Sequence, residues 1–181
     1  MSQGPAATTV QVVEALRRII RAVDLHSRSL VQRYRLTGPQ LVVLRSIAEI
    51  RPSSVGEIAR AAHLSQATVT GILDRLESRG LVTRTRSTDD RRRVHVSLSA
   101  EAEKKLREAP PLLQECFIQN FEKLDPEEQQ RVLGSLEQVV SLMEARELDA
   151  TPILATGPIS ATLERTEAFL RAPDERPLEE D

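Results

Sequence analysis

Five charged residues in a row, Asp89-Asp90-Arg91-Arg92-Arg93, follow Ser87 and Thr88 in a stretch of turn-forming residues. Three neighbouring guanidinium groups repel one another, so the run is unfavourable unless an anion balances the charge. Asp90 precedes Arg92 by two residues, and its carboxylate can bind that guanidinium through two hydrogen bonds and orient it. The run predicts an anion-binding turn. The alternative is a charged turn that meets only solvent.

A second group of polar residues lies at the start of a helix predicted for residues 66–79: Ser65, Gln66, Ala67, Thr68 and Thr70. If this helix enters the major groove of DNA, the Gln amide can donate to and accept from adenine. The Ala and Thr methyl groups can pack on thymine methyls. Farther along, Arg75 and Arg79 can reach phosphates, which position a protein without reading sequence. The alternative is that Ser65 only caps the helix and Gln66 is only solvated.

Basic residues are concentrated in the first 100 positions, where sixteen Arg and eight Asp or Glu give a net charge of +8. Residues 101–181 carry a net charge of −10, and the whole chain carries −2. A basic front and an acidic rear indicate a face that binds a polyanion. The alternative is that the rear helices have acidic faces that meet only solvent.

Composition excludes several classes of protein. Aromatic residues make up 2% of the 181 positions, which argues against binding by ring stacking. One Cys and three His exclude an internal disulfide and a Cys-rich zinc module, and no metal ligand or cofactor is expected. No apolar run approaches the ~20 residues that span a bilayer, and the N-terminus does not resemble a signal peptide. A soluble, cytoplasmic protein is expected.

Hydrophobic periodicity and capping residues then give the elements that must position these side chains. Ser54 and Glu57 form a capping box, Gly80 suits a left-handed helix end, and Ser99 can cap a further helix. Two alternating stretches around the charged turn predict a β-hairpin. Helices are predicted at residues 9–34, 39–49, 55–62, 66–79, after 99 up to a break at 109–111, 112–121, 126–147 and weakly 158–171, with strands at 81–87 and 93–98.

Two short helices joined by a tight turn and followed by a basic hairpin are typical of a winged helix-turn-helix. The predicted fold is mainly α with a small antiparallel β wing. A narrow minor groove attracts inserted Arg side chains, so the wing can bind there. The DNA-binding candidates in the wing are Arg84, Arg91, Arg92 and Arg93, with Asp90 as support.

Residues 40–98 resemble the MarR family of bacterial transcription regulators. The resemblance lies in Leu36-Thr37-x-x-Gln40, Val55-x-Glu57-Ile58-Ala59, Ser65-Gln66-Ala67-Thr68-Val69-Thr70, Leu73-Asp74-Arg75-Leu76-Glu77, Gly80-Leu81-Val82 and Asp90-Arg91-Arg92 followed by Val96-x-Leu98-Ser99. It implies a homodimer, built from the first helix and the last two, on a pseudo-palindromic duplex. It also implies that Asp90 and Arg92 form the wing pair. Ala102 departs from the family, which usually has Gly there, and this bears on the start of the next helix.

Several apolar residues of the first helix lie on more than one face, which favours burial of this helix against a second subunit. Together with the resemblance, this pattern divides the chain into four parts. The parts are an N-terminal dimerisation helix at 1–36, a winged helix-turn-helix DNA-binding domain at 37–100, C-terminal dimerisation helices at 101–147 and a partly disordered extension at 148–181.

A polar cluster at Asp24, His26, Ser27 and Arg28 is the candidate site for a small effector. The resemblance places it near the junction of the dimerisation and DNA-binding parts, where a ligand cleft is expected. Four further segments resemble the branch that controls ectoine and osmoprotectant operons, which nominates a zwitterionic compatible solute. They are Asp24-Leu25-His26-Ser27, Leu36-Thr37-Gly38-Pro39-Gln40, Ala109-Pro110 and Leu148-Asp149-Ala150-x-Pro152. The alternative is a surface pair of Asp24 with Arg28 beside a buried Ser27.

Other functions have less support. The chain has no Gly-rich phosphate loop, metal-ligand spacing or nucleophile elbow, so an enzyme is not expected. A purely structural dimerisation module would not need the Arg-rich hairpin. Cys116 could sense oxidants, but its position on an apolar stripe favours a buried, inert thiol. The sequence predicts a ligand-responsive repressor that binds double-stranded DNA.

Overall fold

The computed structural model describes residues 5–51, 53–86, 94–148 and 153–155. The chain forms two compact units, one of residues 1–109 with 155–181 and one of residues 110–154. No helix in the described ranges is both long and apolar enough to cross a membrane. The four-part division predicted above remains a prediction.

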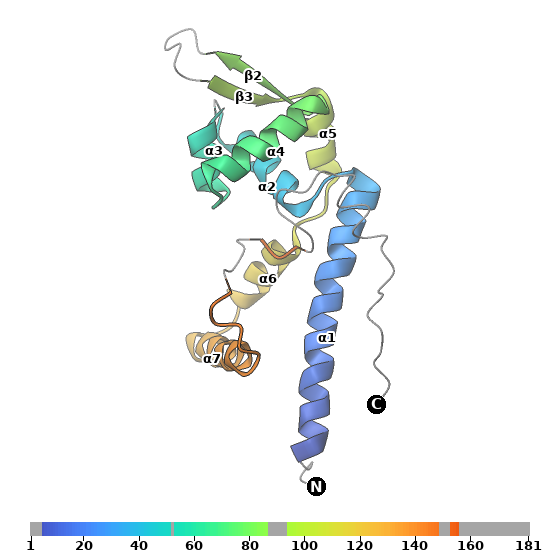
Figure 1. The fold of residues 1–181 in the computed structure, drawn as a ribbon, viewed down its shortest axis with the longest axis vertical. Coiled ribbons are helices and arrows are strands. Elements are labelled where there is room, and N and C mark those ends of the chain that lie inside the picture. Colours follow the sequence, from blue (N-terminus) through green and yellow to red (C-terminus); the bar gives the residue numbers. More distant parts are fainter. Residues whose placement is uncertain (1–4, 52, 87–93, 149–152, 156–181) are drawn as a thin grey trace. The chain divides into compact units, whose positions relative to one another are not determined.

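Helix α1 spans Pro5–Ser29 and is the longest element of the first unit (Figure 1). It begins four residues before the predicted start, because Pro is well accommodated in a first turn and two Ala follow it. The predicted helix does continue to residue 34, but its last turn, η1 at Leu30–Tyr34, is a π-helix. Arg35 then adopts a left-handed conformation with φ of 56° and ends the turn by donating its N–H to the carbonyl of Val31.

Three helices follow, and their caps agree with the sequence. Helix α2 spans Gly38–Glu49, and the Thr37 N–H donates to Gln40 Oε1 at 3.0 Å. Helix α3 spans Val55–Ala61 and begins with the predicted capping box, in which the Ser54 N–H donates to Glu57 Oε2 at 2.8 Å. Helix α4 spans Gln66–Ser78. Gly80 lies at φ of 67°, which confirms the left-handed helix end.

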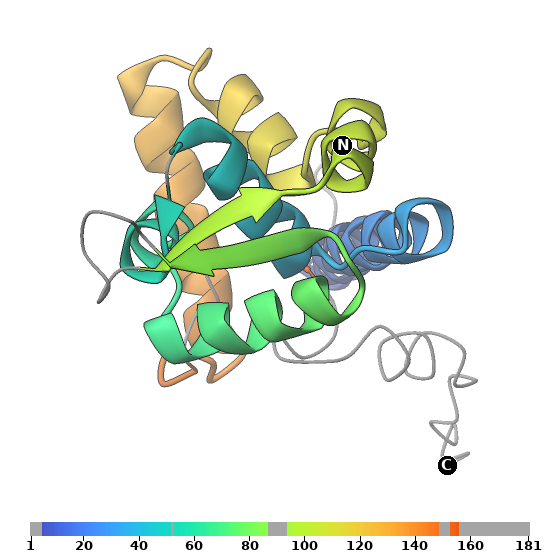
Figure 2. The same ribbon diagram turned by 90° about the horizontal axis from the view of Figure 1, so that it is seen from above.

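The sheet has one strand more than predicted. Strands β2 (Val82–Arg86) and β3 (Val94–Leu98) pair antiparallel, with Arg84 opposite Val96. A two-residue strand, β1 (Ser53–Ser54), pairs with the other edge of β3, so the order is β1-β3-β2. Figure 2 shows β2 and β3 side by side, with α4 alongside β2. The charged turn at residues 87–93 lies outside the described residues.

The core of the first unit lies between α2, α3, α4 and the sheet. Leucine, isoleucine and valine side chains from these elements and from the segments that flank them are buried, and burial of apolar area is the main favourable term in folding. The largest of the fully buried apolar side chains are Leu30, Leu36, Leu41, Leu44, Ile47, Ile58, Ile72, Leu73, Leu76 and Leu81. This packing fixes α4 with its first turn at the surface.

Helix α5 spans Ala100–Glu108, and the Ala102 N–H donates to the capping Ser99 Oγ at 3.2 Å. Ala102 is buried, so its methyl group is accommodated in the packed fold. The predicted break before Pro110 and Pro111 is confirmed, because α5 ends and a new helix starts in the second unit.

The second unit contains α6 (Leu113–Phe121) and α7 (Pro126–Leu142). Asp125 and Glu128 form a capping box at the start of α7. The helix ends five residues earlier than predicted, at a turn in which Glu144 takes φ of 54°. Neither helix has a buried residue in the single chain. The weak helix predicted at 158–171 lies outside the described residues.

Candidate nucleic-acid interface

The first turn of α4 presents polar side chains to solvent. Ser65, Gln66, Ala67 and Thr70 are exposed and Thr68 is half-buried. The Thr68 N–H donates to Ser65 Oγ at 3.1 Å, so Ser65 is the cap that the sequence predicted. Thr70 Oγ1 donates to the carbonyl of Gln66 at 2.8 Å, so its hydroxyl is bound to the backbone of its own helix. The arrangement offers amide, hydroxyl and methyl groups side by side.

Arg75 lies farther along α4, with its side chain close to the bare Cα of Gly71. Its Nε and Nη2 atoms are buried and have no hydrogen-bond partner within the described part of the chain. Burial lowers the pKa of the Arg75 guanidinium from its usual value, and the neighbouring Asp74 carboxylate opposes that shift. Buried N–H donors are costly when unsatisfied, so this cation can gain by binding a phosphate oxygen.

Arg79, which follows the end of α4, is held by the protein itself. Its Nη2 donates to the carbonyl of Arg35, and its Nη1 donates to Gln40 Oε1 at 3.4 Å. These bonds tie the end of α4 to the start of α2. Sequence reasoning predicted only a phosphate contact for Arg79 and missed these hydrogen bonds. A pattern of neighbouring residues cannot indicate a bond to a backbone carbonyl 44 residues away.

Arg84 of β2 is also held within the protein. Its Nη1 lies 2.6 Å from Asp74 Oδ1 and 3.2 Å from Glu77 Oε2, both on α4. The Arg84 side chain is 24% exposed. The pair of bonds fixes the base of the hairpin against α4. The two acids were not singled out from the sequence, although their spacing of three on one helix face could have indicated a shared cation.

The remaining wing candidates are Asp90, Arg91, Arg92 and Arg93, which all lie outside the described residues. The structure does describe the strands on either side of them. Strand β2 ends at Arg86, which pairs with Val94 at the start of β3. The hairpin that the sequence predicted is therefore confirmed, and the contacts of its charged turn remain a prediction.

The polar cluster on α1 forms an ion pair. Arg28 Nε lies 2.9 Å from Asp24 Oδ2, and both side chains are partly exposed. Ser27 is buried and His26 is half-buried. The pair and the buried Ser27 match the alternative given for this segment, a surface pair beside a buried hydroxyl. Partly exposed pairs of this kind contribute little to stability.

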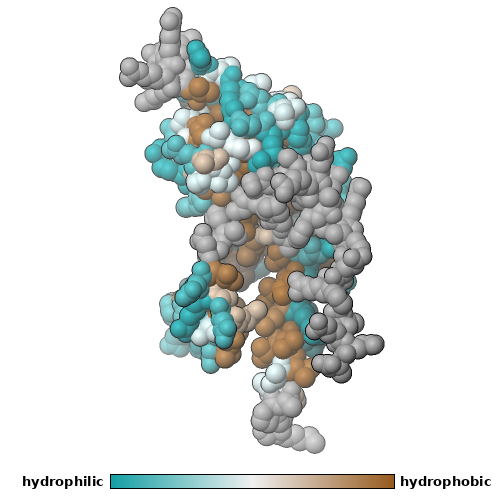
Figure 3. Space-filling view, in the orientation of Figure 1, coloured by the Kyte–Doolittle hydropathy of each residue, from teal (hydrophilic) through white to brown (hydrophobic). Residues whose placement is uncertain are grey.

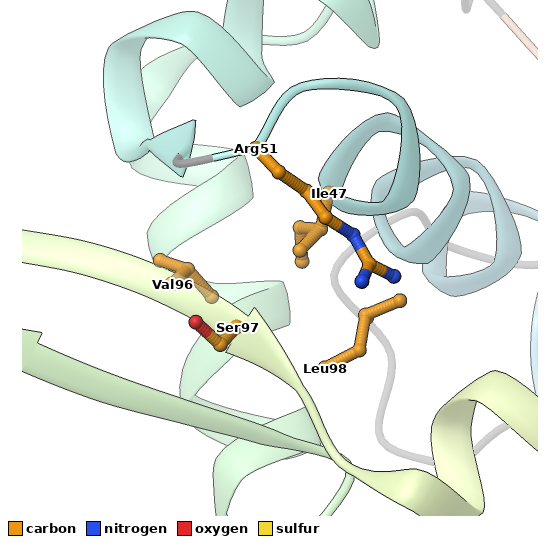
Figure 4. A pocket seen from close by; sticks show the side chains of 5 residues that line it. All are labelled: Ile47, Arg51, Val96, Ser97 and Leu98. Atoms are coloured by element: carbon orange, nitrogen blue, oxygen red, sulfur yellow. The ribbon is translucent and has the colours of Figure 1, made fainter.

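A pocket of about 380 Å³ lies on the first unit, lined by Ile47 of α2, by Arg51 just after α2 and by Val96, Ser97 and Leu98 of β3. Figure 4 shows the Arg51 guanidinium extending toward Leu98, with Ile47 close to the Arg51 side chain and Val96 next to Ser97 on β3. Arg51 Nη2 already lies 3.0 Å from Glu103 Oε1 of α5. The pocket's cation is thus neutralised by the protein, and the pair joins the segment after α2 to α5.

The second unit has its own candidate residue. Cys116 of α6 is a free, half-buried thiol. No group of three or more potential metal ligands is brought together among the residues whose placement is described. The candidate interface on α4 therefore rests on the polar and basic side chains described above.

Known proteins share this sequence pattern and fold. A sequence model of the MarR family matches residues 36–94. The transcriptional regulator HosA of Escherichia coli O127:H6 is 38% identical over 95 residues, 52% of this chain and 70% of HosA. The homoprotocatechuate degradative operon repressor of Escherichia coli is 29% identical over 135 residues, 75% of this chain and 91% of that protein. The S. aureus MepR–DNA complex has a TM-score of 0.52 at 20% identity, covering 72% of this chain and 96% of MepR.

Proposed function

This chain belongs to the MarR family of transcription regulators, and we propose that it is a ligand-responsive repressor that binds a pseudo-palindromic operator as a homodimer. Its general activity follows from membership: it is a DNA-binding winged-helix regulator and not an enzyme. Repression is supported by similarity to the homoprotocatechuate degradative operon repressor over 91% of that protein.

The observation that carries the proposal is the first turn of α4. It combines a helix N-terminus, which favours phosphate, with exposed groups suited to base edges. We propose that Gln66 reads adenine and that Ala67, Thr68 and Thr70 contact neighbouring bases. Arg75 would then turn its guanidinium outward and bind a phosphate, and Ser65 would act as the cap.

The wing supplies the second contact. We propose that Arg92 enters the minor groove with Asp90 orienting it, and that Arg91 and Arg93 contact phosphates. Arg84 supports this arrangement from within the protein, because its bonds to Asp74 and Glu77 hold the hairpin against α4. A base-reading helix and a wing fixed to it can then bind adjacent grooves together.

The homodimer is supported by exposed apolar side chains on the elements expected to form it. Figure 3 shows apolar side chains, in brown, on the surface in the regions of α1 and of α7. Exposed patches of this kind mark association surfaces. The large apolar side chains that are exposed on α1, α6 and α7 are Val10, Val12, Val13, Ile19, Ile20, Leu25, Phe117, Ile118, Leu133, Leu136, Val140 and Leu142.

Selection of bound duplexes from a random pool tests the proposal as a whole. The purified full-length chain is expected to enrich a pseudo-palindrome whose half-sites are about one helical turn, ~10 bp, apart. Enrichment of an asymmetric site would contradict the homodimeric operator complex. Failure to bind any duplex would contradict the proposal in full.

Replacement of Gln66 by Ala is expected to cost ~1–3 kcal/mol of binding free energy on the selected operator and much less on random duplex. The reason is that the lost amide reads a base edge, whereas phosphate contacts remain on both duplexes. Fluorescence anisotropy with both duplexes measures the difference. Equal losses on the two duplexes would mean that Gln66 only positions the protein.

We further propose that the segment from Asp24 to Arg28 binds a small zwitterionic effector, such as a compatible solute. Arg28 Nε and Asp24 Oδ2 lie 2.9 Å apart, and both side chains are partly exposed. A zwitterion carries both charges, so it can pair with Asp24 and with Arg28 at once. An effector changes DNA affinity only through its different affinities for the free and bound conformations. A change of ~1–3 kcal/mol in DNA-binding free energy, or ~5–150-fold, is typical of such coupling.

Arg28→Ala is expected to keep operator affinity and to lose the response when ectoine is titrated into the protein–operator complex. Anisotropy of a labelled operator reports both quantities. The matched control is Arg18→Ala, because Arg18 and Glu14 form another i,i+4 pair on the same helix. If Arg28→Ala responds like the parent, or if both variants lose the response, the effector binds elsewhere.

A further inference from the structure

Gly56 stands in the first turn of α3, where its backbone gives no reason for glycine. Its φ lies outside the left-handed region, whereas Gly80 has φ of 67°. Glycine is among the least favourable residues in a helix, because it loses the most backbone freedom on folding. The reason for glycine at this position must therefore lie in what a side chain would touch.

A Cβ at residue 56 would meet one side chain. It would lie 3.3 Å from Nε2 and 4.0 Å from Cδ of Gln66. Apart from the two chain neighbours and the backbone of α3 itself, no other atom of the described residues would lie within 4 Å of it. The Gln66 carboxamide thus lies close to the bare Cα of α3. A separation of 3.3 Å is closer than ordinary carbon contacts, so a methyl group would displace the amide by a few tenths of an ångström.

We propose that Gly56 is a positioning residue for base recognition: it leaves space in which the Gln66 carboxamide lies against the first turn of α3, in the orientation that reads the operator. The inference rests on the proposed role of Gln66. A glutamine side chain has several rotamers, and fixing them on binding costs free energy. A backbone surface that limits the amide on one side reduces that cost, and a bidentate contact with adenine needs a defined amide plane.

Folding and recognition respond differently to a methyl group at this position. The atom that must move is the far end of an exposed, flexible side chain, so the fold accommodates the change readily. Alanine also favours the helix. Gly56→Ala is therefore expected to leave the melting temperature unchanged or raised while it weakens discrimination. A residue with only a structural role would give the opposite pattern.

The experiment is a double-mutant cycle in the full-length chain. Gly56→Ala, Gln66→Ala and the double variant are titrated with the selected operator and with random duplex, and thermal unfolding is recorded for each. Gln66→Ala is expected to lower the operator-to-random affinity ratio by about 5- to 150-fold. Gly56→Ala is expected to lower it by about 3-fold or more, within the Gln66→Ala loss. In the Gln66→Ala background, Gly56→Ala is expected to change the ratio by less than about 2-fold.

Gly134→Ala is the matched control. It makes the same substitution within a helix, α7, at a position where a Cβ meets nothing within 4 Å. Its spacing from Leu133, Leu136 and Val140 places it away from their apolar stripe. Its affinity ratio is expected to equal that of the parent.

Three results would overturn the inference. If Gly56→Ala leaves the ratio unchanged or raises it while Gln66→Ala lowers it, Gly56 does not orient the amide, and the proposed role of Gln66 survives. If Gly56→Ala weakens both duplexes equally, and does so in the Gln66→Ala background, glycine is needed for close approach of a phosphate. If Gln66→Ala itself leaves the ratio unchanged, the proposed base reading by Gln66 fails together with the inference.

Discussion

Replacement of Ile20 by Asp is expected to abolish tight operator binding while both units stay folded. Ile20 is 62% exposed on α1 in the single chain, so its replacement removes no packing within that chain. In the proposed homodimer the same side chain is buried against the partner, and a buried carboxylate without a counter-ion is strongly unfavourable. The variant is expected to be monomeric.

Loss of the dimer should have a large effect on affinity. A dimer binds its second half-site as an intramolecular step, and such linkage raises affinity by ~10²–10⁴-fold over one module. Operator affinity of Ile20→Asp is expected to fall by that factor. Sedimentation velocity measures the oligomeric state, anisotropy measures the affinity, and circular dichroism checks that helix content is kept.

Gln11→Asp is the control for a new charge on α1. Gln11 is exposed on the same helix, and its spacing places it away from the face shared by Val13, Leu16 and Ile20. This variant is expected to remain dimeric and to bind as the parent does. A monomeric Ile20→Asp that still binds the operator tightly would refute the homodimeric complex, and a dimeric one would remove this face of α1 from the interface.

Insertion of 5 bp between the two half-sites of the selected operator is the second change with a large expected effect. B-DNA repeats every ~10–10.5 bp, so the insertion turns one half-site to the opposite side of the duplex. A two-fold symmetric dimer can then bind only one half-site at a time. Affinity is expected to fall by ~10²–10⁴-fold, to the level of a single half-site.

The control duplex keeps its length and carries substitutions in the same central base pairs. It is expected to bind within a few-fold of the operator, because the spacing is unchanged and only DNA shape differs. Tight binding to the lengthened duplex would show that the two recognition helices are not held at a fixed separation. The dimer geometry proposed above would then be wrong.

The helices and caps of the first unit were predictable because each depends on residues close in sequence. The Ser54–Glu57 capping box, the Ser65 cap and the left-handed Gly80 all follow from side chains within a few positions of the helix end. Strand β1 was not predictable, since two residues are too few for alternation to be seen. Its pairing with β3 is a tertiary contact.

The candidate interface was predictable in part for the same reason. Gln66 and Thr70 are placed at the surface by the period of α4, which the sequence contains. The bonds of Arg84 depend on which helix lies beside β2, and the bond of Arg79 depends on where the carbonyl of Arg35 lies after η1. Both are properties of the packed fold. Sequence reasoning therefore treated the basic residues as one group and did not separate those that hold the fold from those that face outward; their DNA contacts stay a prediction.

The π-helical turn at Leu30–Tyr34 has a consequence for how a signal can travel through the first unit. Carbonyl groups at its end are bound by two cations, Lys105 Nζ at the carbonyl of Tyr34 and Arg79 Nη2 at the carbonyl of Arg35. One cation comes from α5 and the other from the end of α4. We therefore expect a rotation of α1 about its axis to change the angle at which α4 is presented, without a change within α4 itself.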